Sequence, residues 1–282
     1  MVSNKLAVIT GAASGIGLAL TKACIKEGMD IVMADIDEAA LNHQVNLLNV
    51  LTGSQVVGIA CNVSKEEDVK RLAGDVFERF KRVDLLINNA GIMGHLAPIW
   101  ELSLNHVRHV LDVNLYGVLH GVQSFLPFML EQEHRSHIVN MASFYGLCSG
   151  SQMAAYAMSK HAIVALSESV YFDLHRLNKP VDISVVCPSF TDTKLMLHSA
   201  PENTTVLHQM VEKLMSHSRS ADDVADHILQ EIKNNTFYIL PDQEVKQYCE
   251  QRTKAISEQT MPHEHNIEKI LAALSIRSTA FE

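Results

Sequence analysis

The sequence has no run of basic residues and no long apolar stretch. Lys and Arg number 23 against 32 Asp and Glu, which gives a formal net charge of −9. An acidic chain without a basic patch is poorly suited to the phosphate backbone of nucleic acid or to an anionic lipid surface. No apolar run approaches the ~18 residues of a membrane span. We therefore expect neither a nucleic-acid partner nor a segment that crosses a membrane.

Paired cysteines and a targeting segment are also missing. The five cysteines are an odd number, and none of them is spaced as CxxC. Reduced thiols in a cytoplasmic protein fit this pattern better than a disulfide framework or a zinc site. The N-terminal residues MVSNKLAVITG do not place a long apolar segment after a charged one, so we expect no signal peptide. Together these features predict a cytoplasmic location.

The 15 histidines are scattered rather than grouped. Their one tight group is HEH at 263–265, in a polar tail, where histidines are more often solvated than bound to metal. We expect no metal site.

Short apolar runs rich in β-branched residues alternate with longer amphipathic stretches. The runs are LAVIT (6–10), DIVMAD (30–35), QVVGIACNV (55–63), DLLINNAG (84–91), HIVNMAS (137–143), DISVVCPS (182–189) and FYILP (237–241). Near-continuous hydrophobic runs are typical of strands covered on both faces. Helical spacing between such strands predicts one α/β domain over residues 1–242, with a doubly wound, parallel, seven-stranded sheet. Residues 243–282 then form a polar C-terminal extension.

A glycine-rich segment, TGAASGIG at 10–17, follows the first predicted strand directly. Gly11, Gly15 and Gly17 would open a helix there and let backbone N–H groups approach a pyrophosphate. An ordinary turn would also explain a glycine cluster taken alone. Its position between the first strand and a helix favours a dinucleotide site.

Asp35 ends the second predicted strand, where a carboxylate can accept hydrogen bonds from the adenosine ribose. A capping role is the alternative, because DIDE at 35–38 would also start a helix. The same carboxylate would repel a 2′-phosphate, and neither Ser14 nor Ile36 supplies a compensating positive charge. These residues predict NAD rather than NADP.

The segment YAMSK at 156–160 places a phenol one helical turn before an ammonium group. Residues four apart share one face of a helix, so Lys160 should lower the pKa of Tyr156 from its usual value near 10. A phenol adjusted in this way can exchange a proton during catalysis. A chance pair on a solvated face would look the same in isolation.

In combination, these motifs resemble a short-chain dehydrogenase/reductase, over about residues 4–242. The resemblance rests on TGxxxGxG at 10–17, NNAG at 88–91 and YxxxK at 156–160, with Ser143 placed 13 residues before the tyrosine. It implies a Rossmann fold and an oxidoreductase that transfers hydride between a nicotinamide and an alcohol or ketone. The implied catalytic residues are Asn114, Ser143, Tyr156 and Lys160.

The resemblance also implies a role for each catalytic residue. Tyr156 is the general acid/base, Ser143 holds the reacting oxygen, and Lys160 both favours the phenolate and holds the nicotinamide ribose. Asn114 would hold a water that relays the proton, although it could instead satisfy backbone groups. The implied cofactor contacts are Gly11, Ser14, Gly15, Ile16, Gly17, Asp35, Ile36, Asn62, Val63, Asn89, Ala90, Gly91, Tyr156, Lys160, Pro188, Ser189, Thr191 and Thr193.

Two positions depart from the family pattern. Asn62 replaces an acidic residue that binds the adenine amino group, a bond that an amide oxygen can also accept. Ser189 replaces the glycine of a Pro-Gly pair, where it could add a donor toward substrate.

The substrate side is expected to be apolar. The expected substrate residues are His95, Ser143, Phe144, Tyr145, Met153, Phe190 and Met196. In the family, the stretch at about 194–218 forms a lid, and here it is rich in methionine, which adapts to bulky apolar shapes. No arginine lies in this expected lining. We therefore expect a hydrophobic secondary alcohol or ketone, with packing on the domain as the alternative role of these side chains.

Three alternatives and an assembly state complete the expectations. A 3-oxoacyl thioester reductase is disfavoured by Asp35 and the acidic charge, and a catalytically idle NAD-binding sensor or scaffold by the intact set of catalytic residues. Sugar epimerases and dehydratases are longer and differ in glycine spacing. The resemblance implies a homotetramer or dimer that pairs the long helices starting near Ser103 and Tyr156.

Overall fold

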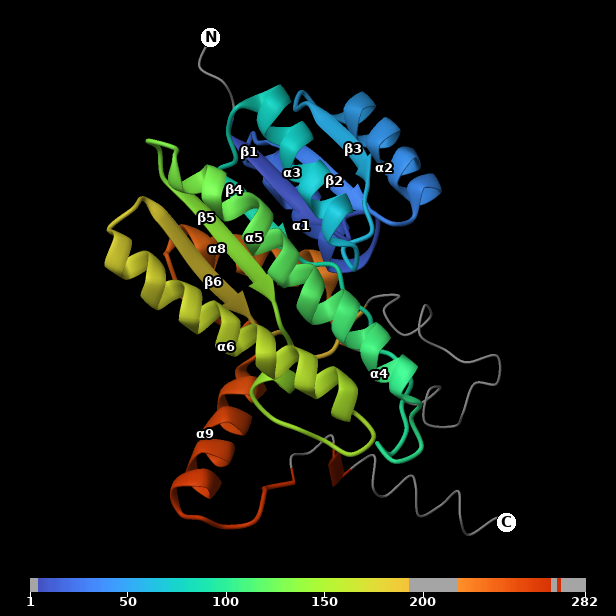
Figure 1. The fold of residues 1–282 in the computed structure, drawn as a ribbon, viewed down its shortest axis with the longest axis vertical. Coiled ribbons are helices and arrows are strands. Elements are labelled where there is room, and N and C mark those ends of the chain that lie inside the picture. Colours follow the sequence, from blue (N-terminus) through green and yellow to red (C-terminus); the bar gives the residue numbers. More distant parts are fainter. Residues whose placement is uncertain (1–4, 193–217, 265–267, 270–282) are drawn as a thin grey trace.

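The computed structural model describes residues 5–192, 218–264 and 268–269 and contains the expected parallel sheet (Figure 1). The strands are β1 (Leu6–Thr10), β2 (Asp30–Asp35), β3 (Val56–Ala60), β4 (Leu85–Asn88), β5 (Ser136–Met141), β6 (Val181–Val186) and β9 (Tyr238–Ile239). Their order is β3-β2-β1-β4-β5-β6-β9, and every neighbouring pair is parallel. Strands β2 and β3 extend the sheet on one side of β1, and the chain then crosses to the other side of β1 to form β4 and the strands after it. This reversal confirms the doubly wound α/β prediction.

Helices cover both faces of the sheet. They are α1 (Gly15–Lys26), α2 (Glu38–Leu51), α3 (Glu66–Phe80), α4 (Leu104–Leu111), the single-turn π-helix η1 (Asp112–Tyr116), α5 (Gly117–Leu130), the 3₁₀ turn η2 (Phe144–Gly146), α6 (Ala154–Leu177), α8 (Ala221–Lys233) and α9 (Gln243–Ser257). Two short strands, β7 (Thr191–Asp192) and β8 (Arg219–Ser220), pair separately. No helix in the described part of the chain is long and apolar enough to cross a membrane.

The core consists of two layers, one on each face of the sheet. Helices α3, α5 and α6 contribute Leu72, Phe125 and Ile163 to one layer, whereas α1 and α8 contribute Leu20 and Ile228 to the other. Figure 1 shows α5 and α6 lying side by side across the near face, with α8 behind the strands. Because the strands are buried on both sides, they carry apolar residues at consecutive positions instead of alternating ones.

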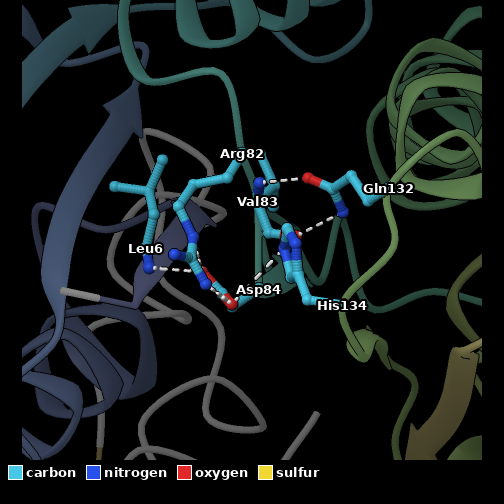
Figure 2. A network of polar contacts seen from close by, with 6 residues as sticks. All are labelled: Leu6, Arg82, Val83, Asp84, Gln132 and His134. Carbon is cyan, nitrogen blue, oxygen red and sulfur yellow. Dashed lines mark hydrogen bonds and ion pairs between the residues drawn. The ribbon is translucent and has the colours of Figure 1, made fainter. Parts of the chain in front are cut away.

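A polar network around Asp84 joins the amino ends of the strands (Figure 2). Asp84 accepts hydrogen bonds from the Leu6 backbone N–H at 2.8 Å and from Arg82 Nε at 2.8 Å, and His134 Nε2 lies 3.5 Å from its carboxylate. Gln132 brackets the intervening Val83, accepting from its N–H and donating to its carbonyl. The network fixes the start of β4 against β1 at the amino ends of the strands, whereas the site described below lies at their carboxyl ends.

Candidate active site

The glycine loop after β1 has a backbone that side chains would not allow. Gly11 and Gly15 have φ values of +63° and +54°, in the left-handed region. A Cβ on Gly11 would lie 2.8 Å from Ala90 Cα, and one on Gly17 would overlap the Gly11 carbonyl oxygen. The loop therefore holds its backbone close to the chain that follows β4.

The NNAG segment holds this loop in place. Asn89 Nδ2 donates to the carbonyls of Thr10 and Gly11, at 2.9 and 3.2 Å. In return, the Thr10 hydroxyl accepts from the backbone N–H groups of Asn89 and Ala90. Asn89 and Ala90 thus shape the loop, besides any contact they make with a ligand.

The amino end of α1 fits the pyrophosphate of a dinucleotide. Ser14 precedes the helix in an extended conformation, and its side chain makes no capping hydrogen bond. The first turn carries no acidic residue, so neither a side-chain acceptor nor a negative charge competes for the N–H groups at Gly15, Ile16 and Gly17. The glycine loop and this helix end together form a backbone cradle suited to a pyrophosphate.

Asp35 lies beside this cradle, at the carboxyl end of β2. Its two carboxylate oxygens accept from Ala13 N–H at 2.9 Å and Asp37 N–H at 3.0 Å, which leaves lone pairs on both for ribose hydroxyls. The helix cap of α2 is Asp37, which accepts from Ala40 N–H, so the capping role does not fall to Asp35. The neighbouring Ile36 is 69% exposed.

Asn62 adopts a geometry that opposes its expected role. Its side-chain oxygen accepts from both the N–H and the hydroxyl of Ser64, at 3.1 and 2.7 Å. These two bonds use both acceptor positions of the amide oxygen, because the side chain closes a local Asx-type turn. The amide oxygen is therefore not free to accept from adenine, and only Nδ2 remains for a ligand. Val63 is buried beneath Gly117.

The four expected catalytic residues come together at the carboxyl end of the sheet. Tyr156 and Lys160 lie on α6, Ser143 follows β5 and precedes η2, and Asn114 lies in η1. All four are buried, with exposed fractions of 7% for Tyr156, 4% for Lys160, 6% for Ser143 and 0% for Asn114. A Cβ on Gly91 would lie 3.5 Å from Lys160 Nζ and 3.2 Å from Asn114 Oδ1, so the loop after β4 closes against both.

Asn114 uses its side chain to join three segments. Its Oδ1 accepts from Ile92 N–H at 2.8 Å, while Nδ2 donates to the Ile92 carbonyl and to the Ser159 hydroxyl. These bonds match the alternative in which Asn114 satisfies backbone groups and holds the loop after β4 against α6. Asn114 lies in the π-helical segment η1, and single-turn π-helices are frequent at functional sites.

The electrostatics of the Tyr156–Lys160 pair reverse the expected direction. Burial raises the pKa of Tyr156 to about 12, against a hydrogen bond from Ser143 that lowers it. Burial likewise lowers the pKa of Lys160 to about 8. Helical spacing correctly made the two side chains neighbours, but the largest cause of each pKa shift is desolvation by burial, which disfavours the charged form of both groups.

The segment after β6 is held by the chain that enters α9. The Pro188 carbonyl accepts from Phe144 N–H at 2.9 Å, and Thr191 Oγ1 donates to the Ser189 carbonyl. Ser189 donates from its N–H to Asp242 and from its hydroxyl to Glu244. Its hydroxyl is therefore directed to α9. The expected contacts Thr193 and Met196 lie outside the described residues, as does the lid segment apart from Ser218.

An apolar cluster surrounds the Tyr156 side chain. It contains Met93, Leu96, Phe144, Tyr145, Cys148, Met153, Tyr156, Ala157, Val245 and Tyr248, with Phe190 packed against it. His95, on the loop after β4, packs against His106 with ring centres 4.3 Å apart and tilted ring planes, and burial lowers the pKa of His95. Of the expected substrate residues, Phe144, Tyr145 and Met153 lie in this cluster and Phe190 packs against it.

Two members of this cluster were missed by sequence reasoning. Val245 and Tyr248 belong to α9, within the segment expected to be a polar extension, and both are buried. Their three-residue spacing on an otherwise polar helix is the one signal in the sequence that could have identified them. Figure 1 shows α9 beyond the carboxyl ends of the strands, near the loop that leads into α6.

Comparisons with known proteins identify the family of the chain. The sequence profile of the short chain dehydrogenases matches residues 5–204. The chain is 31% identical over 283 residues to a CLA biosynthesis dehydrogenase/reductase of Lactiplantibacillus plantarum, covering 95% of this chain and 98% of that protein. It is 33% identical over 251 residues to a 1-deoxy-11-beta-hydroxypentalenate dehydrogenase of Streptomyces exfoliatus, covering 87% and 86%.

A solved structure is similar over nearly its whole length. A short-chain dehydrogenase/reductase from Burkholderia phymatum, in complex with NAD, superposes with a TM-score of 0.88 at 35% identity, covering 93% of this chain and 98% of that one. The chain belongs to the short-chain dehydrogenase/reductase family. It is therefore an oxidoreductase built around a nicotinamide cofactor site.

Proposed function

We propose that the protein is an NAD-preferring dehydrogenase that interconverts a hydrophobic secondary alcohol and its ketone. The observation that carries the proposal is the position of Tyr156 in an apolar cluster, with the buried side chains of Ser143 and Lys160 next to it. An enzyme acting on sugars or polyols would need several polar partners around this ring. The related hydroxypentalenate dehydrogenase supports the reaction class.

Each of the four buried polar residues has a separate role in the proposed reaction. When bound, the nicotinamide ring supplies or accepts the hydride. Tyr156 exchanges the proton of the substrate hydroxyl. Ser143 hydrogen-bonds to Tyr156 and would also hold the reacting oxygen of the substrate in position. Lys160 keeps a positive charge near the Tyr156 ring, which stabilises the phenolate as it forms, and would also hold the nicotinamide ribose. Asn114 fixes the loop after β4 by accepting a hydrogen bond from the Ile92 N–H, and this loop closes against Lys160 at Gly91.

The preference for NAD is part of the proposal. Asp35 keeps carboxylate lone pairs for the hydroxyls of an adenosine ribose, and Ile36 offers no positive charge to a 2′-phosphate; both features support NAD. The similar Burkholderia phymatum protein is in complex with NAD, which supports the same cofactor. The expected cofactor contacts that the structure describes follow the carboxyl ends of β1, β2, β3, β4 and β6 or lie on α6.

We further propose a homo-oligomer, a dimer or tetramer, that pairs helices α4 to α6. Large apolar side chains are exposed on these helices, namely Leu104, Tyr116, Phe128, Met158 and Phe172. Exposed apolar surface of this kind is typical of subunit contacts. Light scattering at micromolar concentration tests this, and a stable monomer would contradict it.

A substrate panel tests the proposed reaction. Secondary alcohols and ketones, from polyols to apolar compounds, are assayed by cofactor absorbance with NAD and NADP in parallel. We expect turnover of apolar members with NAD in preference to NADP. Turnover confined to polyols would overturn the substrate class, whereas NAD binding without turnover of any member would favour an idle sensor or scaffold.

A further inference from the structure

The loop between β6 and β7 borders the reacting end of the cofactor site. Its Pro188 carbonyl accepts a hydrogen bond at 2.9 Å from the N–H of Phe144, the residue that follows Ser143. Strand β6 lies on the opposite side of β1 from β2, which ends at Asp35. A dinucleotide with its adenosine ribose at Asp35 therefore extends its nicotinamide half toward Ser143 and this loop.

The first residues of α9 and the residue before it hold this loop. Ser189 donates from its N–H to Asp242 Oδ2 at 2.8 Å and from its hydroxyl to Glu244 Oε1 at 2.5 Å. The backbone of Ser189 is not in the left-handed region, so a serine occupies this position without strain. The hydroxyl that distinguishes Ser189 from the glycine of the family pattern is thus used to attach the loop to α9.

Asp242 joins three segments through its carboxylate. It has the N-cap position of α9, where aspartate is favoured, yet its side chain makes no capping bond to the helix. Instead Oδ2 accepts from Ser189, and Oδ1 lies 3.7 Å from Arg219 Nη1. Arg219 also donates to the Pro241 carbonyl at 2.6 Å, and it pairs with Thr191 between β8 and β7. The Asp242 side chain is only 11% exposed, so solvent screens these interactions little.

Helix α9 is itself fixed at the catalytic cluster. Val245 and Tyr248 follow Glu244 on this helix, and both are buried in the apolar cluster that contains Tyr156. The helix that holds the loop after β6 is therefore anchored by apolar packing beside the proposed acid/base.

We propose that Asp242 and Glu244 are positioning residues that hold the loop after β6 in place for the nicotinamide half of the cofactor. A loop that is fixed before binding does not have to be ordered by the cofactor, so less of the binding free energy is lost. Both residues act through Ser189 and not on the reacting atoms. The inference rests on the proposed location of the reaction at Ser143 and Tyr156, and it adds α9 to the elements that shape the cofactor site.

The first experiment compares the binding of NAD and ADP-ribose by calorimetry. ADP-ribose lacks the nicotinamide ring, so it can occupy the glycine cradle without placing a ring beside the loop. Asp242→Ala should weaken NAD binding about tenfold, the loss that corresponds to one charge-assisted hydrogen bond, and should change ADP-ribose binding less than about twofold. Asp242→Asn keeps an acceptor oxygen for the Ser189 N–H and should restore most of the NAD affinity.

The second experiment tests whether Glu244 acts through Ser189. Glu244→Ala should weaken NAD binding roughly threefold, whereas Glu244→Gln keeps an acceptor for the hydroxyl and should weaken it less. In a Ser189→Gly background, Glu244→Ala should have no further effect, because the donating hydroxyl is already gone. Glu250→Ala is the matched control: it removes an exposed carboxylate of the same helix that does not contact Ser189, and NAD binding should stay unchanged.

The two probes separate a positioning role from a general structural one. Equal losses of NAD and ADP-ribose affinity in Asp242→Ala, or no loss of either, would overturn the proposal. The Ser189 and Glu244 variants keep the Asp242 carboxylate, so they decide the matter if Asp242→Ala does not fold, and additive losses in the double variant would then overturn it.

The same measurements are independent of the proposed reaction, because binding requires no turnover. A selective loss of NAD affinity in a protein that oxidises no alcohol would retain the positioning role and contradict the proposed function. Normal turnover of apolar alcohols, with an unchanged ratio of NAD to ADP-ribose affinity in the variants, would do the reverse.

Discussion

The ammonium group of Lys160 lies 5.5 Å from the centre of the Tyr156 ring and donates a hydrogen bond to the carbonyl of Met141 at 2.9 Å. The end of β5 therefore anchors the lysine, so that its charge faces the ring. The pair is positioned by two elements, because α6 sets the spacing and β5 sets the direction.

Replacing Tyr156 by Phe should remove turnover and leave NAD binding near normal. The ring and its packing remain, and only the proton-exchanging hydroxyl is lost, which for general acid/base catalysis corresponds to a loss of about 10²- to 10⁴-fold in kcat. Stopped-flow or steady-state kinetics, together with NAD titration, measure the two effects. Lys160→Ala should damage both, because it is assigned two roles. A Tyr156→Phe protein that kept most of its rate for every substrate would rule out Tyr156 as the acid/base.

Asp35→Ala combined with Ile36→Arg should shift cofactor preference toward NADP by at least about tenfold. The first change removes the repulsion of a 2′-phosphate and the second supplies a guanidinium for it. The ratio of kcat/KM for the two cofactors is the measurement, with Ile36→Arg alone as the control for added charge. Equal use of NAD and NADP by the wild type would show that the argument from Asp35 is wrong.

Asp84→Asn should lower the free energy of unfolding by about 2–3 kcal/mol. The buried carboxylate accepts from Arg82 and the Leu6 N–H, and the amide leaves the guanidinium without its charge partner. Asp182→Asn is the matched control, because it breaks an Arg–Asp pair with Arg135 whose arginine is 68% exposed, worth less than about 1 kcal/mol. Urea unfolding compares the two, and equal losses would contradict the role of Asp84.

His137 should make the fold sensitive to acid. Ser184 Oγ donates to the Thr236 carbonyl at 2.6 Å, so it accepts from His137 Nε2, 2.7 Å away, which fixes the neutral tautomer with the proton on Nε2. Burial lowers the pKa of His137 to about 4 from 6.5. Between these values the unfolded chain binds a proton that the folded protein does not, so stability is complete above pH 6.5 and falls as the pH drops toward 4, by roughly 3 kcal/mol in total.

Unfolding free energies at several pH values between 7 and about 4 test this assignment. The His137→Phe variant loses the bond to Ser184 at every pH but keeps no titrating ring, so its stability should fall less steeply with acid than that of the wild type. Parallel pH curves for the two proteins would show that His137 does not titrate in this window.

Much of the site could be predicted from sequence, because its parts are local. The glycine loop requires backbone angles that only glycine adopts freely, as Gly11 and Gly15 show, and apolar runs covered on both faces specify a parallel sheet. Asp35 follows from the length of a βαβ unit. Tyr156 and Lys160 follow from the helical repeat.

Other features were decided by the tertiary structure alone, since they depend on which groups lose water and which segments meet. The raised pKa of Tyr156 and the lowered pKa of Lys160 come from burial, which no spacing rule contains. The amide oxygen of Asn62 accepts a hydrogen bond from the Ser64 hydroxyl, and this local bond takes the place of the expected bond to adenine. Helix α9 has a polar sequence, but packing against Phe144 buried its Tyr248, because long-range contacts are specified by the shape of the whole domain.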